Sequence, residues 1–285
     1  MGLIEEILIF GTIKGCIYAL IATGFTLIFA VAGILNLAHG SFFMLGAYLS
    51  YTLYDTLQLP LLVAILFSAI SVGIIGILID RILLRPMRQS HTYVLVITVA
   101  VAFALQEIIL LLYGPQGRNI PNIIPGSISL VGVSVSWHQI LIVVFTAIIL
   151  TILWLILTKT KHGLASLAVS MDEVGAKFVG IEPENVFKLI MFASAFMAAI
   201  AGALITPIMS MNPLMWEMPL MKAFVVVVIG GLGSVLGSVL AAFILGWVET
   251  FTGFLISPNL TSIVSLAMLT GILIFKPSGI FGRRK

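Results

Sequence analysis

Apolar tracts of about 20 residues, the length of a membrane-spanning helix, recur along the whole chain and leave no long polar stretch between them. Lipid cannot satisfy unpaired backbone polar groups, so tracts of this length favour helices that cross the hydrocarbon core. Only 9% of the residues are charged, against about a quarter in an ordinary soluble domain. We therefore predict an all-α integral membrane protein that forms one transmembrane domain over residues 1–285, with no large soluble domain.

The predicted fold is a polytopic bundle of about eight or nine membrane segments that includes broken or half-length helices. The candidate spans are 7–33, 40–55, 61–84, 92–113, 138–158, 189–209, 218–231, 234–254 and 260–276. Segment 218–231 is short for a full crossing. Interrupted apolar segments in the first and last thirds of the chain suggest two pseudo-repeats.

The placement of basic residues predicts how the spans are oriented, because short loops rich in Lys and Arg stay in the cytoplasm. Three segments carry such residues: Arg81, Arg85 and Arg88; Lys159, Lys161, Lys177 and Lys188; and Lys276, Arg283, Arg284 and Lys285. The number of spans between them allows all three to lie inside. The C-terminus is then cytoplasmic and the N-terminus outside. The net charge of +3 reflects this orientation and does not indicate nucleic-acid binding.

Two apolar stretches are interrupted by residues that are unusual in a membrane helix. "GILNLAHGS" contributes Asn36, His39, Gly40 and Ser41, and "VIGGLGSVLGS" contributes Gly230, Gly231, Gly233 and Ser234. Non-helical backbone at membrane depth needs a water-filled or protein-lined cavity. We predict that the two breaks meet and border a translocation pathway, and that Asn36 or Ser41 caps a half-helix starting near Ser41.

Each break also has a plainer interpretation. Small residues let membrane helices pack closely, and for "GGLGSVLGS", residues 230–238, packing and pathway are equally supported. Asn36 and His39 both need polar partners in a dry setting. For His39, a structural bond to a neighbouring carbonyl is favoured over proton transfer.

Charged residues inside the predicted spans are costly and therefore informative. They are Lys14, Glu107, Lys222 and Glu249. Lys222 either lines an outer vestibule of the pathway or, as the favoured alternative, is an interfacial lysine or pairs with Glu217 or Glu249. We expect Glu107 to form a helix-to-helix hydrogen bond. Nothing in the sequence accounts for Lys14.

Asp80 and Arg81 lie near a predicted cytoplasmic end of a span. A local ion pair, or side chains that extend to the membrane surface, accounts for them there. The single cysteine, Cys16, excludes an intrachain disulfide and is expected to serve packing.

Residues 159–188 form the longest predicted cytoplasmic stretch. Met171, Val174, Phe178 and Ile181 recur at helical spacing while Asp172, Glu173 and Lys177 face elsewhere, which predicts one short amphipathic helix. Gly180 followed by Pro183 ends it, and a second short helix is expected after Pro183. The apolar stripe is covered either by the membrane domain, by the lipid interface or by a groove on a soluble partner.

Three stretches together resemble the permease subunits of branched-chain amino-acid ABC importers. They read "GCIYALIATGFTLIFAVAGILNLAHGSFFMLGAY", "HGLASLAVSMDEVGAKFVGI" and "MKAFVVVVIGGLGSVLGSVLAAFILGWVE". The resemblance covers nearly the whole chain. It implies a multi-pass, non-enzymatic subunit of the plasma (bacterial inner) membrane that forms the pathway for branched-chain or related amino acids. Asn36 to Ser41 would border that pathway, and the segment with Asp172, Gly180 and Ile181 would dock on an ATPase.

The resemblance also implies partners. These are two cytoplasmic ATPase subunits, an extracytoplasmic solute-binding protein and a second permease subunit, for which a homologous heterodimer is favoured over a homodimer. The partners would use the ATP, since this sequence contains no GxxxxGK[ST] phosphate loop. We expect this chain to bind no cofactor and no metal.

The sequence departs from the family pattern at several positions. The family often has an acidic residue where Ser41 stands, arginines where Leu164 and Leu167 stand, and a small polar or apolar residue where Lys14 stands. The first departure leaves the substrate open. The second suggests a less basic contact with the ATPase or an altered pairing within the transporter.

Two alternatives in function remain at this point. One is a permease for another small solute, such as urea or an amide, a sugar or a nucleoside. The other is an ion-coupled secondary transporter, a class that also uses broken helices but needs buried acids. Only Glu107 and Glu249 are available for that role, and neither lies in a break. A membrane enzyme is disfavoured because the sequence has no HExxH motif and no Ser/His pair near a strained glycine turn.

Overall fold

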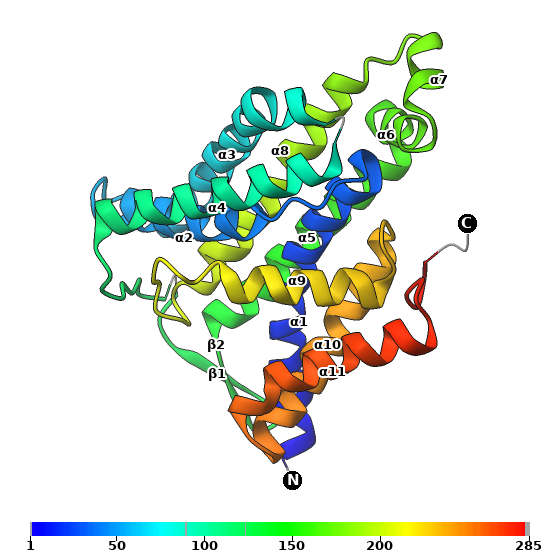
Figure 1. Cartoon of the computed structure of the whole chain (residues 1–285). Helices are drawn as coiled ribbons and strands as arrows, with labels where there is room; N and C mark the ends of the chain where they lie inside the picture. The colour runs from blue at the N-terminus through cyan, green and yellow to red at the C-terminus, as the bar shows by residue number, and fades with distance from the viewer. Residues whose placement is uncertain (1, 89, 123, 283–285) are drawn as a thin grey trace.

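The computed structural model describes residues 2–88, 90–122 and 124–282 and is predominantly helical (Figure 1). The helices are α1 (Leu3–Ala32), α2 (His39–Asp55), α3 (Leu61–Ile79), α4 (His91–Tyr113), α5 (Trp137–Lys159), α6 (Lys161–Met171), α7 (Glu173–Phe178), α8 (Pro183–Ile205), α9 (Glu217–Gly230), α10 (Val235–Leu255) and α11 (Thr261–Phe275). The shorter elements are η1 (Asp80–Leu84), η2 (Arg85–Met87), η3 (Pro258–Leu260) and the strands β1 (Ser127–Leu130) and β2 (Val133–Ser136).

Within the described residues, 7 helical segments are long and apolar enough to cross a membrane. They are α1, α3 with η1 and η2, α4, α5, α8, α10, and η3 with α11. The other two apolar helices, α2 and α9, have 17 and 14 residues. The predicted polytopic bundle with short helices is confirmed, and each predicted span corresponds to one helix. The largest difference is at 189–209, because the short helix expected after Pro183 is instead the beginning of α8.

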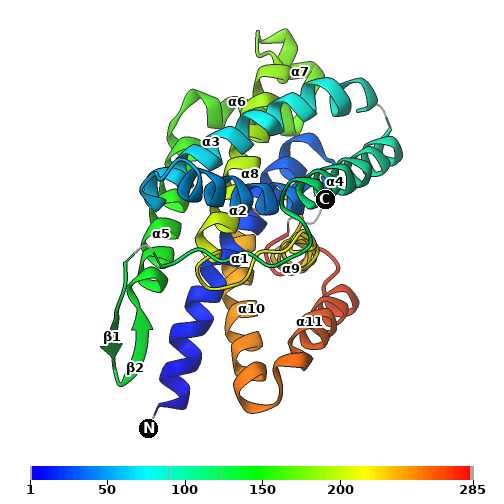
Figure 2. The ribbon, with the colours of Figure 1, turned by 90° about the vertical axis from the view of Figure 1, so that its left-hand side faces the viewer.

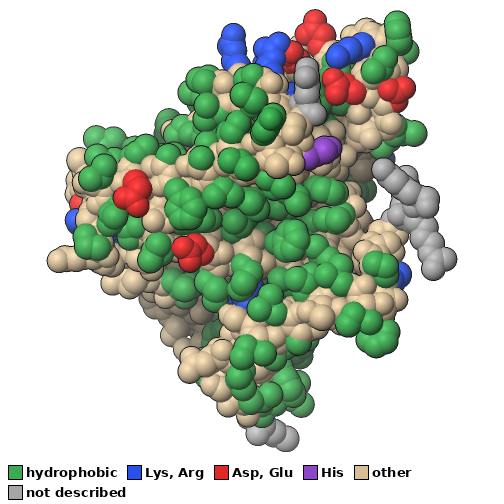
Figure 3. All heavy atoms as spheres, in the orientation of Figure 1, with side chains coloured by type: hydrophobic (Ala, Val, Ile, Leu, Met, Phe, Trp, Pro, Cys, Tyr) green, Lys and Arg blue, Asp and Glu red, His purple; other side chains and the backbone are tan. Residues whose placement is uncertain are grey.

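The helices run between two distinct ends of the molecule. The N-terminus, the β1–β2 hairpin and the turn from α10 to α11 lie at one end, and α6 and α7 lie at the other (Figures 1 and 2). Charged side chains gather near α6 and α7, while most of the face over α4, α9 and α11 is apolar (Figure 3). Which end is cytoplasmic stays a prediction, and Arg283, Arg284 and Lys285 lie outside the described residues.

Helix α1 is the axis of the bundle and packs against α10, α8, α9 and α5. Gly11 and Gly15, one turn apart on α1, lie against Gly246 of α10. A Cβ on Gly246 would lie 2.5 Å from the Gly11 carbonyl oxygen, so the two backbones touch. Small residues that permit such contact are a usual source of helix association in lipid.

The hairpin of β1 and β2 lies between α4 and α5, where we predicted no strand. The strands pair antiparallel from Ser127 with Ser136 to Leu130 with Val133. Val131 and Gly132 form the turn with φ of 51° and 83°, the left-handed pair that two-residue hairpins require. Alternation of serine with apolar residues on both sides of this turn was the available sequence signal.

The order of helix lengths is the same in α1–α4 and α8–α11: one long helix, one short helix, then two longer ones. However, the first break precedes the short helix α2, whereas the second follows the short helix α9. The two breaks therefore do not occupy corresponding places in the two sets, contrary to our expectation. The equivalence of the two halves stays a prediction.

Candidate functional site

The first break, residues 33–38, connects α1 to α2. Helix α1 ends with a left-handed residue at Gly33, and the Asn36 side-chain oxygen accepts a hydrogen bond from the Ala38 backbone N–H at 3.1 Å. The N-cap of α2 is Ala38, whose methyl group cannot cap a helix. The predicted capping by Asn36 or Ser41 is therefore wrong. Asn36 instead shapes the turn before the helix, and Ser41 donates to the Ala102 carbonyl of α4.

His39 is the first residue of α2 and is fully buried. Its Nε2 lies 2.8 Å from the carbonyl oxygen of Ile21 in α1, and its Nδ1 lies 3.1 Å from the hydroxyl of Ser194 in α8. A carbonyl oxygen only accepts, so Nε2 carries the proton and Nδ1 accepts from Ser194. His39 thus makes the hydrogen bond to a neighbouring carbonyl that we favoured over a role in proton transfer.

The second break, residues 231–234, connects α9 to α10. Gly231 and Gly233 have φ of 102° and 86°, which side chains with a Cβ rarely adopt. Ser234 caps α10 by accepting from the backbone N–H of Gly237 at 3.1 Å. Gly230 instead permits close packing of the chain, because a Cβ there would lie 2.5 Å from the Gly237 carbonyl oxygen. Within this motif, Gly231 and Gly233 therefore provide the irregular backbone, and Gly230 provides the close packing.

The segment after α11 closes over the second break. The backbone N–H of Ile280 donates to the carbonyl of Ile229 at 2.8 Å, and that of Phe281 donates to the carbonyl of Gly230 at 3.1 Å. The final carbonyls of a helix lack partners within the helix, so residues 276–282 complete the end of α9. No residue pattern in the sequence had indicated this contact.

The second break lies beside the beginning of the first. A Cβ on Gly233 would lie 3.7 Å from the Cα of Ala30 near the end of α1. The start of α2 contacts the other end of α9, where a Cβ on Gly40 would lie 2.5 Å from the carbonyl oxygen of Trp216. Most of the predicted pathway residues are nevertheless buried within the chain: Asn36, His39, Gly40, Ser41, Gly230 and Gly231. Gly233 and Ser234 are partly exposed.

Lys222 lies apart from the breaks, about 12 Å along α9 from Gly230, in a charged cluster centred on Glu249. One carboxylate oxygen of Glu249 accepts from Lys222 at 2.6 Å and from Ser265 at 2.5 Å. The other accepts from Tyr18 at 2.7 Å and from Lys14 at 2.9 Å. The cluster joins α1, α9, α10 and α11.

This cluster answers two questions that the sequence left open. Lys222 is a partner of Glu249, the favoured alternative, and its side chain is 5% exposed, so it lines no open vestibule in this structure. Lys14, 38% exposed, is the second cation on the same carboxylate. Glu107 is exposed. Its neighbour Gln106 makes a hydrogen bond to another element instead, because it accepts from Trp216 at 2.7 Å.

The segment at the other end of the molecule, residues 159–188, forms two short helices before Pro183, where we predicted one. Asp172 is extended and its side-chain oxygen accepts from the Val174 backbone N–H at 2.9 Å. It therefore caps α7 and separates it from α6. Met171, Val174 and Phe178 are exposed, and Phe178 reaches 87%, so the described part of the chain does not cover these three residues of the predicted stripe. Ile181 differs, because it is partly buried against the core.

Helix α7 ends as its glycine predicts. Gly180 has φ of 83°, its N–H donates to the Lys177 carbonyl, and the N–H of Ile181 donates to the Ala176 carbonyl, both at 3.0 Å. This pair of bonds is the Schellman motif, which requires a left-handed residue at the Gly180 position. The chain then enters α8 at Pro183 after only two more residues.

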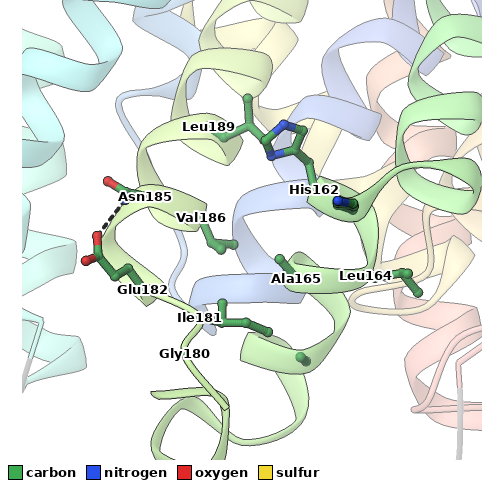
Figure 4. A pocket seen from close by; sticks show the side chains of 11 residues that line it. His162, Leu164, Ala165, Gly180, Ile181, Glu182, Asn185, Val186 and Leu189 are labelled. Atoms are coloured by element: carbon green, nitrogen blue, oxygen red, sulfur yellow. Dashed lines mark hydrogen bonds between the residues drawn. The ribbon is translucent and has the colours of Figure 1, made fainter. Parts of the chain in front are cut away.

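A groove lies between α6 and the start of α8 (Figure 4). Its volume is ≈ 970 Å³. His162 and Ala165 of α6 face Asn185, Val186 and Leu189 of α8 across it, with Ile181 and Glu182 at the junction.

The turns η1 and η2 hold the beginning of α8. Arg88 donates to both oxygens of Asp80 at 2.6 and 2.7 Å, and its guanidinium carbon lies 4.1 Å from the centre of the Phe187 ring. Arg85 pairs with Glu184. The local ion pair expected for Asp80 is present, with Arg88 and not with Arg81 as its cation.

Comparison with known proteins gives a consistent result over the full chain. The model of the family described as "Branched-chain amino acid transport system / permease component" matches residues 7–273. The chain is 31% identical to the high-affinity branched-chain amino acid transport system permease protein BraD of Pseudomonas aeruginosa, over 97% of this chain and 95% of that one. It is also 31% identical to LivH, the permease protein of the same description, from Escherichia coli strain K12, over 96% and 94%.

A more distant relative is the probable branched-chain amino acid transport permease protein LivH of Methanocaldococcus jannaschii, 27% identical over 92% of this chain and 88% of that one. Among solved structures, PsaBC from Streptococcus pneumoniae in complex with Fab matches 98% of this chain and 93% of its own. The TM-score is 0.56 and the identity 14%, which shows a shared fold and nothing more.

Proposed function

Because this chain belongs to the family of branched-chain amino acid transport permease components, we propose that it forms the translocation pathway for branched-chain or related amino acids in an ATP-driven importer. The match over 7–273, which includes both breaks and the α6–α7 segment, is the observation that carries this proposal. The same match favours it over a permease for a different solute and over an ion-coupled transporter.

The pathway is proposed to follow the two adjacent breaks. Irregular backbone at membrane depth is tolerated where it lines a cavity or is covered by protein, and both breaks lie where α1, α2, α9 and α10 meet. Since most break residues are buried in this chain, the pathway needs a second permease subunit or a change of conformation to become wet. We propose a homologous second subunit, together with an extracytoplasmic solute-binding protein that delivers the solute.

The exposed surface of α6 and α7 is the proposed contact for two cytoplasmic ATPase subunits. This surface carries Met171, Val174 and Phe178 without cover from the described part of the chain, beside the ion pair of Glu173 and Lys177. An amphipathic helix that inserts its apolar side chains into a groove is a recurrent mode of recognition. With this end in the cytoplasm, the N-terminus lies outside and the C-terminal segment inside.

Replacing Phe178 by alanine is expected to weaken binding of the ATPase at least thirtyfold, the effect of losing an aromatic anchor worth about 2 kcal/mol. ATP-driven uptake of labelled leucine into proteoliposomes that hold the complete complex should fall in proportion. The fold should be unaffected, because Phe178 is 87% exposed. Leu111→Ala is the matched control, since Leu111 is 83% exposed and lies on α4, outside the α6–α7 segment. Normal ATPase binding by the Phe178 variant would contradict the assignment.

Cysteines placed in the breaks should react with small water-soluble thiol reagents while the complex is transporting. Cys16 is buried and can be replaced by alanine to provide a background without thiols. Ser234→Cys and Asn36→Cys are expected to be modified during turnover, and Ser68→Cys, buried in α3, is expected to stay unmodified. If neither break cysteine reacts in any state of a working complex, the pathway does not run there.

A further inference from the structure

We propose that His39 is a positioning residue that transmits movement of α8, and through α8 movement of the α6–α7 segment, to the first break. This inference rests on the proposed function, because it assigns a role in coupling ATP hydrolysis to transport. It arises from α8, which is the next helix after α7 in the chain and contacts both α1 and α2.

Helix α8 is suited to carry a displacement. It begins at Pro183, directly after the α6–α7 segment, and continues without interruption to Ile205. Ser194 lies about 16 Å along the helix from Pro183 at 1.5 Å per residue. The contacts of Arg85 with Glu184 and of Arg88 with Phe187 fix the first turns of the same helix to η2 and the residue that follows it. A rigid shift at one end of α8 therefore reaches Ser194.

At Ser194 the shift meets a joint of three helices. The hydroxyl of Ser194 donates to Nδ1 of His39 at the start of α2, and Nε2 of His39 donates to the Ile21 carbonyl of α1. The ring fits between the helices because Gly24 has no side chain, since a Cβ there would lie 3.0 Å from Cε1 of His39 and 2.9 Å from the Ser194 carbonyl oxygen. Both bonds are directional, so movement of α8 acts on the orientation of α2 against α1.

A second contact lies on the other side of the same break. Met191, one turn before Ser194 on α8, has its sulfur 3.8 Å from the side-chain nitrogen of Asn36. The side-chain oxygen of Asn36 accepts a hydrogen bond from the backbone N–H of Ala38. Helix α8 therefore touches the break at Asn36 and at His39, the residues that shape its turn and begin its second helix.

The joint is buried, which makes its bonds hard to replace. His39 and Ser194 are both fully buried, so water cannot readily take the place of a lost partner, and an unpaired polar group is left inside the protein. If His39 and Ser194 served packing alone, loss of their hydrogen bond would affect transport no more than loss of any other buried hydrogen bond. A coupling role predicts that loss of the bond to α8 has a specific effect on transport.

The test compares two serines in the reconstituted complex, with ATP hydrolysis and uptake measured together. Ser194→Ala removes the bond between α8 and His39. Ser238→Ala is the matched control, because Ser238 is equally buried in α10 and its hydroxyl bonds Thr26 of α1 at 2.6 Å. Both variants should lose similar thermal stability. Only Ser194→Ala is expected to lower the amino acid transported per ATP hydrolysed, by about fivefold, the lower end of typical couplings between sites.

His39→Gln provides an independent arm. Its amide N–H can still donate toward Ile21, but it lacks the ring nitrogen that accepts from Ser194. It should lower the transport-to-ATP ratio as Ser194→Ala does, and the double variant should be no worse than either single change, because both remove the same bond.

The ratio of amino acid transported to ATP hydrolysed distinguishes failure of this inference from failure of the proposed function. An unchanged ratio in Ser194→Ala, or an equal fall in Ser238→Ala, overturns the role of the joint while uptake by the unmodified complex upholds the function. Absence of ATP-driven uptake by the unmodified complex overturns the proposed function and this inference together.

Discussion

Replacing Gly202 by alanine is expected to destabilise the protein by about 3 kcal/mol or more and to reduce the yield of folded permease. A Cβ at this position would lie 1.9 Å from the Phe43 carbonyl oxygen of α2, far inside the contact distance of real atoms. The obstacle is backbone, so no side-chain rotation can relieve it. Helices α2 and α8 must separate, and the contact is reciprocal because a Cβ on Gly46 of α2 would lie 2.2 Å from the Ala199 carbonyl oxygen.

Thermal unfolding in detergent measures this effect. Gly271→Ala is the matched control, since Gly271 also lies inside a helix but its added Cβ would meet no atom of the described residues within 4 Å. That control should be neutral or stabilising by about 0.5–1 kcal/mol, because alanine is favoured over glycine inside a helix. A Gly202→Ala protein as stable as the Gly271 variant would show that α2 and α8 do not meet as described.

Replacing Glu249 by glutamine is expected to cost about 3–5 kcal/mol of folding free energy, the usual penalty for removing one partner of a buried ion pair. Glutamine keeps the size of the side chain but removes the negative charge that faces Lys14 and Lys222. Lys222 is 5% exposed and Lys14 is 38% exposed, so Lys222 is left with the larger penalty. Lys222→Met in the Glu249→Gln background should therefore restore part of the lost stability.

The control for this change is Glu217→Gln, because Glu217 is an exposed carboxylate in the first turn of α9. Its replacement is expected to change stability by no more than about 0.5 kcal/mol. Detergent-solubilised variants can be compared by their unfolding midpoints and by the yield of monodisperse protein. Equal midpoints for Glu249→Gln and Glu217→Gln would mean that the four-helix cluster does not form.

The membrane helices could be predicted from sequence because hydropathy and length report directly on the solvent around a span. The break at Asn36 and His39 was recognisable for the same reason, as polar residues in an oily tract. What these residues bind was not recognisable. His39 meets Ser194 across 155 residues of chain, and Glu249 of α10 meets Lys14 of α1, far away in the sequence. No local pattern encodes such pairs.

Two other differences, at the α6–α7 segment and at the β1–β2 hairpin, arise where local capping and turn geometry compete with hydrophobic periodicity. Helical spacing alone joined Met171 to Ile181 in one stripe, although Asp172 is a strong N-cap residue and divides the segment in two. Similarly, the alternating serines and apolar residues around Val131 and Gly132 describe a hairpin. In both places short-range hydrogen bonding decided the structure over hydrophobic periodicity.

The pairing of Ile280 and Phe281 with the end of α9 bears on how the protein is made. Synthesis proceeds from the N-terminus, so α9 and α10 leave the ribosome before the residues that complete them. During that interval the carbonyls of Ile229 and Gly230 lack their final donors, and both residues are buried in the folded chain, where unpaired backbone is costly. The connection between α9 and α10 therefore reaches its native form only after residue 281 has been translated. Insertion of these helices into the bilayer precedes completion of the site that they form.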